Sequence, residues 1–316
     1  MTLRTLLENG AGGAVALSAP DRPSLSYHQL RAHIDTIGQQ LAGQGLSSTD
    51  RVAIVLPNGP EMASAFLAVA CYMSAAPLNP SYKQSEYEFY LSDLKPALVI
   101  VEQRSENPVR QAAQGLGIPV VEAKVEAGMA AGAFSLFDKT AEISPADAEA
   151  EALVLHTSGT TSRPKVVPLL QKNMLASARN IAASLELTDA DHCLNIMPLF
   201  HIHGLIAVLI SSLGKGASVC CSPGFNALKF MELAATEAIS WYSGVPTMHQ
   251  AILLRAKRNP EQAKALHLRF IRSSSASLPP AVFEELVKVF GCPVIEAYGM
   301  TAVSYTHLTL PTILLV

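Results

Sequence analysis

The sequence predicts an α/β protein built on mainly parallel sheets flanked by helices. Short apolar runs alternate with longer helical patterns almost throughout the 316 residues. This alternation is typical of strand-helix-strand units. Hydrophobic residues make up 49% of the chain, which is enough for a large buried core. A chain of this length is expected to form two domains, or one large domain with a subdomain.

Eight runs are predicted to be strands, because each is short, apolar and bounded by turn residues or charges. They are residues 51–56, 97–101, 152–157, 193–197, 217–221, 239–244, 269–275 and 293–298. Helix-length segments lie between them.

Three of these segments are predicted helices. Residues 27–45 have glycines near their end, and residues 280–291 begin at Pro280 and stop at Gly291, the order that favours a helix. Residues 62–78 are uncharged and alanine-rich, but they carry two serines and run into Pro77. They therefore predict a buried helix and no membrane span.

The domain boundaries follow from composition. Residues 102–150 are small, acidic and turn-rich, which predicts a surface connection. We therefore expect an N-terminal subdomain over residues 1–150 and a second subdomain over residues 151–301. Residues 302–316 end on apolar side chains without a following helix to cover them, and are expected to be a non-native tail.

Charge and cysteine content exclude several classes of protein. The formal net charge is −3, with Lys and Arg spread along the chain, so no nucleic-acid partner is expected. The N-terminus is a poor signal peptide because glutamate, asparagine and glycines interrupt it. The cysteines show no CxxC pair and no ligand spacing, which predicts buried, reduced thiols in a cytoplasmic protein. They are Cys71, Cys193, Cys220, Cys221 and Cys292.

The segment TSGTTSRPK, residues 157–165, predicts a phosphate-binding loop. It follows the strand at 152–157 and precedes a helix expected to start near Leu170, so it would lie at the carboxyl end of a parallel strand, where open α/β sheets bind ligands. Hydroxyls and backbone N–H groups can surround phosphate oxygens, and Lys165 adds a positive charge. Pro164 and Val166 exclude a Walker sequence. The alternative is a Ser/Thr-rich turn without a ligand.

Two further segments follow in order, MPLFHIHG at 197–204 and YGMT at 298–301. Together the three motifs resemble those of the AMP-forming acyl-adenylating family, which includes acid-CoA ligases, luciferases and peptide-synthetase adenylation domains. The resemblance covers about residues 20–301. It is closest to the oxalate-CoA ligase branch, because of the segment RSSSASL at 272–278 and the Ser-Arg pair before PK. It implies the family's large N-terminal domain, with mainly parallel sheets in two subdomains and the C-terminal domain missing.

The resemblance also implies the substrates and the residues that bind them. The substrates would be ATP with Mg²⁺, CoA and a small carboxylic acid. The loop over the outer phosphates would consist of Thr157, Ser158, Gly159, Thr160, Thr161 and Lys165. The nucleotide would be lined by Ser275, Ala276, Tyr298, Gly299, Met300 and Thr301. The catalytic residues would be His201, Lys165 and Thr301.

The acid pocket is expected to be polar. His201 of the PxxH segment would lie beside the acid, and hydroxyl groups could satisfy a second carboxylate that an apolar slot would reject. The pocket residues would be His201, Ser243, Ser273, Ser274 and Ser277, with Ser275 beside them. His201 could instead cap the following helix. His201 and His203 could form half a metal site, but no further ligand at suitable spacing supports one, so no metal site is predicted.

Three departures from the family pattern predict impaired activity. Val166 replaces a glycine and is expected to strain the loop. Ala302 replaces the glutamate that the family uses for Mg²⁺. The ribose-binding aspartate and the C-terminal domain with its lysine are missing. We therefore expect a truncated acid-CoA ligase that is inactive or impaired. The alternatives are a non-catalytic nucleotide-binding remnant and a peptide-synthetase-type adenylation domain.

Overall fold

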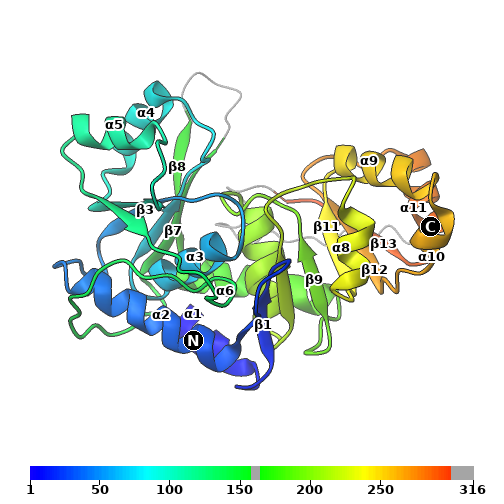
Figure 1. Cartoon of the computed structure of the whole chain (residues 1–316), viewed down its shortest axis with the longest axis horizontal. Coiled ribbons are helices and arrows are strands. Elements are labelled where there is room, and N and C mark those ends of the chain that lie inside the picture. Colours follow the sequence, from blue (N-terminus) through cyan, green and yellow to red (C-terminus); the bar gives the residue numbers. More distant parts are fainter. Residues whose placement is uncertain (158–163, 300–316) are drawn as a thin grey trace.

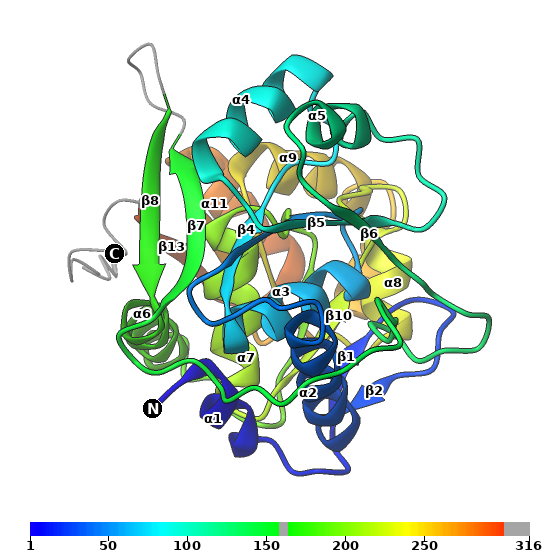
Figure 2. The same cartoon turned by 90° about the vertical axis from the view of Figure 1, so that its left-hand side faces the viewer.

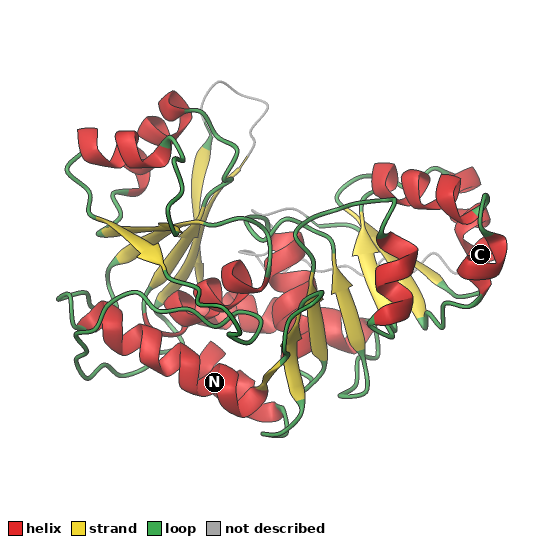
Figure 3. Ribbon diagram, viewed as in Figure 1, coloured by secondary structure: helices red, strands yellow, loops and turns green. Residues whose placement is uncertain are grey.

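The computed structural model describes residues 1–157 and 164–299. Over these residues the chain forms two mainly parallel sheets flanked by helices, so the predicted α/β class is confirmed (Figure 3). None of the helices in these ranges is long and apolar enough to cross a membrane. The predicted tail, residues 302–316, lies outside the described residues.

The first sheet has the strand order β6-β5-β3-β4-β7-β8 in the described part of the chain. Its strands are β3 (Arg51–Val55), β4 (Ser74–Pro77), β5 (Leu98–Glu102), β6 (Val120–Ala123), β7 (Glu151–Thr157) and β8 (Lys165–Leu170). Neighbouring strands are parallel except in the β7–β8 hairpin, which stands at the edge of the molecule in Figure 2.

The second sheet has the strand order β13-β12-β11-β9-β10-β1-β2 over the same ranges. Its strands are β1 (Val15–Ser18), β2 (Leu25–Ser26), β9 (His192–Asn195), β10 (Ser218–Cys221), β11 (Trp241–Gly244), β12 (Phe270–Ser274) and β13 (Val294–Ala297). Here only the short β1–β2 pair is antiparallel among the described strands.

The helices lie on the faces of the two sheets and between them (Figure 1). In chain order they are α1 (Leu3–Leu6), the 3₁₀-helix η1 (Leu7–Asn9), α2 (Tyr27–Ala42), α3 (Pro60–Tyr72), α4 (Gln84–Leu94), α5 (Val109–Gly115), α6 (Gln171–Ser184), the π-helix η2 (His203–Ile210), α7 (Ser211–Leu213), α8 (Phe230–Thr236), α9 (Pro246–Ala256), α10 (Pro260–Lys264) and α11 (Pro280–Phe290).

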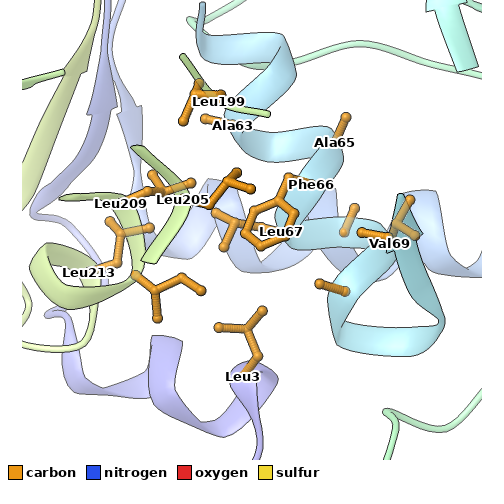
Figure 4. Packing of buried hydrophobic residues seen from close by; sticks show 14 of the residues in the cluster. Leu3, Ala63, Ala65, Phe66, Leu67, Val69, Leu199, Leu205, Leu209 and Leu213 are labelled. Atoms are coloured by element: carbon orange, nitrogen blue, oxygen red, sulfur yellow. The ribbon is translucent and has the colours of Figure 1, made fainter. Parts of the chain in front are cut away.

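Helix α3 lies at the centre of the largest hydrophobic cluster. Its side chains pack beside leucines of α1, η2 and α7 (Figure 4). Phe66 and Leu67 are fully buried there, together with Leu209 of η2. Residues from both sheets belong to this cluster, so it joins the two halves of the molecule. Burying this much apolar surface is the main favourable term in folding.

All eight predicted strands are confirmed as β3, β5, β7, β9, β10, β11, β12 and β13. The helix predicted over residues 280–291 is confirmed as α11, with a proline at its start and Gly291 in the left-handed conformation after its end, at φ 67°. The helix predicted from residue 27 is α2, which ends at Ala42. The cysteines are buried, as predicted.

Two predictions of local structure are wrong. Residues 62–78 do not form one helix, because α3 ends at Tyr72 and β4 follows between β3 and β7. An unbroken apolar run does not reveal where a helical period gives way to a strand. Residues 102–150 are not only a surface connection, since they contain α5 and the strand β6.

The expected subdomain boundary at residue 150 stays a prediction, and the sheets are not divided along it. Strands β1 and β2 belong to the second sheet although they lie near the N-terminus. Strands β7 and β8 belong to the first sheet although they follow residue 150. Each sheet therefore combines segments from both sides of the boundary.

Candidate functional site

The predicted phosphate-binding segment joins two antiparallel strands. β7 ends at Thr157 and β8 begins at Lys165, and these two residues are paired across the hairpin. The helix expected to start near Leu170 is confirmed as α6, which begins at Gln171, but the strand β8, which runs back along β7 before it, was not predicted. Lys165 is exposed at the end of the hairpin where β7 leads toward β8. Ser158, Gly159, Thr160 and Thr161 lie outside the described residues.

The start of β8 shows no backbone strain. Val166 pairs with His156 of β7 and does not have a positive φ, so the strain expected at Val166 is not found. Its β-branched side chain suits an extended strand. His156 also ties the hairpin to α4, because its Nε2 lies 3.0 Å from Oδ2 of Asp93 and its ring meets the ring of Tyr90 edge-on at 4.7 Å.

A polar row crosses the second sheet toward the carboxyl ends of its strands. Asn195, Ser243 and Arg272 lie side by side on β9, β11 and β12. Because successive side chains on a strand alternate between faces, all three lie on one face of the sheet. The row two residues earlier on that face is apolar and consists of Cys193, Trp241 and Phe270. The sheet thus turns from apolar to polar where parallel sheets usually bind ligands.

Four side chains at this end of the sheet form a hydrogen-bonded group, which we call the polar cluster: His203, Ser243, Arg272 and Ser275. Nη1 of Arg272 lies 3.1 Å from Nε2 of His203 and 3.1 Å from Oγ of Ser243. Ser243 Oγ lies 2.6 Å from the same His203 nitrogen. Nδ1 of His203 lies 3.0 Å from Oγ of Ser275.

The geometry of the polar cluster fixes the protonation of His203. Arginine can only donate, so Nε2 of His203 accepts from Arg272 and the imidazole proton resides on Nδ1, which donates to Ser275. Burial and the charge of Arg272 hold the pKa of His203 well below its usual value. His203 is therefore neutral at pH 7 and orients the guanidinium without adding charge.

Arg272 is a buried positive charge. Its exposed fraction is 6%, and burial lowers the pKa of its guanidinium to about 10, which still leaves it protonated at pH 7. No ion pair involves Arg272 within the described residues. The undescribed stretches 158–163 and 300–316 contain no aspartate or glutamate. Arg272 therefore has no side-chain carboxylate partner in this chain.

Four of the residues predicted to line the nucleotide directly follow two neighbouring strands. Ser275 and Ala276 follow β12, and Tyr298 and Gly299 follow β13. The two strands are parallel, and Ser274 Oγ donates to the carbonyl of Ala297 at 2.9 Å. The structure therefore brings these four predicted residues to one edge, where all four are exposed. Met300 and Thr301 lie outside the described residues.

Ser275 has an unusual backbone. Its φ is 75°, in the left-handed region that glycine favours and that costs other residues energy. Non-glycine residues in this region concentrate at functional sites. The hydrogen bond to His203 gives this serine a partner in that conformation.

The predicted serine wall is not gathered on one surface. Ser273 and Ser274 are consecutive on β12, so they point to opposite faces of the sheet. Ser273 is fully buried, and its hydroxyl has no hydrogen-bond partner in the described structure. Ser277 is exposed. Of the serines predicted for the pocket, Ser243 and Ser275 join the polar cluster.

His201 precedes η2 and is exposed, with its ring beside that of Phe200 at 4.5 Å. It makes no side-chain hydrogen bond with the described residues. The histidine two positions later, His203, makes the contacts that were expected of a pocket residue. Sequence reasoning weighed His203 only as a metal ligand and did not single out Arg272, although RSSSASL begins with it.

No group of three or more His, Cys, Asp or Glu side chains in the described ranges is arranged to hold a metal ion. A cavity of about 880 Å³ lies elsewhere, lined by residues such as Asn58, Lys229 and Glu237. None of the predicted site residues lines it. We therefore place the candidate site at the carboxyl ends of β11, β12 and β13.

Comparison with known proteins gives a consistent family. The family model described as AMP-binding enzyme matches residues 8–313. An oxalate-CoA ligase from Arabidopsis thaliana is 41% identical over 97% of this chain and 62% of its own length. An oxalate-CoA ligase from Saccharomyces cerevisiae is 37% identical over 81% of this chain and 51% of its own length. A sulfoacetate-CoA ligase from Cupriavidus necator is 32% identical over 89% of this chain and 57% of its own length.

Solved structures agree on the fold. Apo MatB from Rhodopseudomonas palustris superimposes with a TM-score of 0.82 at 24% identity, over 95% of this chain and 60% of that chain. An o-succinylbenzoate CoA synthetase from Bacillus subtilis, in complex with an acyl-adenylate intermediate, gives a TM-score of 0.79 at 25% identity. The match covers 98% of this chain and 60% of that chain. This chain spans between half and two thirds of the length of these relatives.

Proposed function

Since the chain belongs to the AMP-binding enzyme family, we propose that it carries the ATP and acid sites of an acid-CoA ligase. In this reaction a carboxylate oxygen attacks the α-phosphate of ATP, forming an acyl adenylate and releasing pyrophosphate. The thiol of CoA then attacks the acyl carbon, forms the thioester and releases AMP. The protein must bring two anions together and neutralise the charge on the leaving oxygens.

The identity of 41% to an oxalate-CoA ligase, over 97% of this chain, is the observation that carries this proposal. Oxalate and sulfoacetate, which name two of the relatives, are both short acids with a second anionic group. We therefore propose a short acid of this kind as the substrate, with oxalate as the first choice.

The residue roles are part of the proposal. Thr157 and Lys165, with Ser158, Gly159, Thr160 and Thr161 between them, would bind the outer phosphates. The pairing of Thr157 with Lys165 supports this role, because it puts the lysine at the mouth of the loop. Tyr298, Gly299, Met300 and Thr301 would line the nucleotide with Ser275 and Ala276. His201 would lie beside the acid.

Mg²⁺ would enter as the MgATP complex. In phosphoryl-transfer sites Mg²⁺ is commonly held by substrate phosphates with one or two carboxylates. The protein's own residues would orient the phosphates and the acid.

Exchange of labelled pyrophosphate into ATP tests the proposal. Oxalate-dependent exchange by the 316-residue chain is expected to be weak, and a form extended with the C-terminal portion of a relative is expected to exchange faster. Exchange by neither form, with MgATP still bound, would favour the alternative of a non-catalytic nucleotide-binding protein. Exchange with amino acids in place of oxalate would favour a peptide-synthetase-type adenylation domain.

A further inference from the structure

The strongest unexplained feature of the molecule is the lone charge of Arg272. Taking a charge out of water is costly unless a partner and hydrogen bonds compensate it. Arg272 sits on β12 in the interior of the second sheet, and it forms no ion pair with any side chain of the described residues. A guanidinium that is 6% exposed and has no side-chain carboxylate partner can serve as a binding site for an anion from outside the chain.

The unused edge of Arg272 has the right shape. Its Nη1 is occupied by His203 and Ser243, while Nε and Nη2 make no hydrogen bond with any described residue. Nε and Nη2 form the edge that donates two parallel hydrogen bonds to one carboxylate.

Three other arginines of this chain use this same edge. Arg4 donates from Nε and Nη2 to Asp35 at 2.7 and 2.9 Å. The Arg51–Glu151 pair has the same two distances. In the third pair, Arg269 donates to Asp191 at 3.0 and 2.8 Å. Arg272 presents the same edge without its carboxylate.

The surroundings keep this edge in place. His203 is neutral and is held by Ser275, so it fixes Nη1 without competing for the anion. Ser243 lies opposite Arg272 on the neighbouring strand and accepts the second Nη1 hydrogen bond. Asn195, next in the polar row, has a buried Nδ2 without a hydrogen-bond partner in the described structure. Unpaired donors, Nε and Nη2 of Arg272 and Nδ2 of Asn195, therefore lie in this row of the sheet.

We propose that Arg272, oriented by His203 and Ser243, binds the second carboxylate of a short dicarboxylic acid while the first carboxylate is adenylated. This inference rests on the proposed function and adds its specificity determinant. An acid without a second carboxylate would leave the guanidinium buried and unpaired, so the site would discriminate against it. Arg272 is thus a receptor for the non-reacting end of the substrate.

Calorimetric titration of the 316-residue chain with oxalate and with acetate, without Mg²⁺, tests the inference. Arg272→Met should weaken oxalate binding by about 10- to 100-fold, as expected for losing hydrogen bonds to a charged group, and leave acetate binding unchanged. Arg272→Lys should give an intermediate loss of oxalate affinity, because lysine keeps the positive charge but cannot donate two parallel hydrogen bonds to one carboxylate. Arg258→Met is the matched control, since Arg258 is an exposed arginine outside the polar cluster.

A thermal melt with and without oxalate distinguishes an arginine that binds the ligand from one that only supports the fold. Oxalate should raise the melting temperature of the wild-type chain and of Arg258→Met, and should not raise that of Arg272→Met. Without oxalate, Arg272→Met should melt close to wild type, because removal of a buried charge offsets the loss of the hydrogen bonds to His203 and Ser243.

Several results would overturn the inference: equal oxalate binding by wild type and Arg272→Met, no oxalate binding by wild type, or a large loss of stability in Arg272→Met without ligand. If the chain binds MgATP and exchanges pyrophosphate equally well with acetate and oxalate, the inference fails while the proposed function stands. If MgATP does not bind at all, the proposed function fails.

Discussion

Arg272 and Ser243 lie opposite each other on neighbouring parallel strands, with Nη1 of the arginine 3.1 Å from the serine hydroxyl oxygen. The strand register alone creates this contact, because the two residues are 29 positions apart in the sequence. It converts the end of an otherwise apolar sheet face into a place where a charged group can be held. The first prediction concerns this contact.

Ser243→Ala should lower both oxalate affinity and stability. The change leaves one Nη1 hydrogen of Arg272 unpaired in a buried place and removes the 2.6 Å contact with His203. A lost buried hydrogen bond of this kind costs about 1–3 kcal/mol. Urea denaturation and oxalate titration measure the two effects. Ser81→Ala, at an exposed position, serves as the control, and equal behaviour of the two variants would contradict the role given to Ser243.

Stability should fall as the pH is lowered from about 7 to about 5. Burial lowers the pKa of His249 from 6.5 to about 4, so the unfolded chain takes up a proton in this range that the folded chain refuses. The linkage relation then gives a loss of about 2 kcal/mol from this histidine alone. The loss begins near the unfolded pKa and stops growing below about pH 4.

His249→Phe should reduce the pH dependence by about that amount. The comparison uses the change of unfolding free energy between the two pH values, so it is insensitive to the loss of the 3.1 Å contact between Tyr242 and His249. His28→Phe, at an exposed position, is the control substitution and is measured over the same pH range. An identical slope in all three proteins would show that His249 is not held neutral.

Gly204→Ala should destabilise the chain by about 1–3 kcal/mol, the usual result of forcing atoms into a packed interior. A Cβ at this position would lie 2.5 Å from the carbonyl oxygen of Pro198, which belongs to the backbone and cannot rotate away. Because Gly204 follows His203, the displacement should also weaken oxalate binding. Gly13→Ala is the control, since a Cβ there would meet no atom within 4 Å. Chemical denaturation of both variants measures the difference.

Much of the fold could be predicted because apolar runs with turn residues at both ends mark buried parallel strands. Strands that were not predicted lack this pattern of an apolar run between turn residues. β4 continues the apolar run of α3, and β8 contains Pro168, which lowers the strand signal. β2 has only two residues.

The site was predicted less completely than the fold. Motifs along the chain indicated the hairpin loop and the residues after β12 and β13, because these are contiguous segments. The polar cluster depends on the register of β11 against β12 and on the packing of η2, neither of which a single sequence reveals. Nor does the sequence show that Arg272 is buried, since most arginines lie at the surface.

Titration of the 316-residue chain with MgATP, followed by calorimetry, tests the central claim most directly. We expect one saturable site. Lys165→Met should bind MgATP about tenfold more weakly, because it loses a charge at the mouth of the loop, and should keep the wild-type stability, because Lys165 is exposed. Lys215→Met, at another exposed lysine, should bind like wild type. If no MgATP binds to the chain or to its extended form, or if Lys165→Met and Lys215→Met bind equally, the account is contradicted.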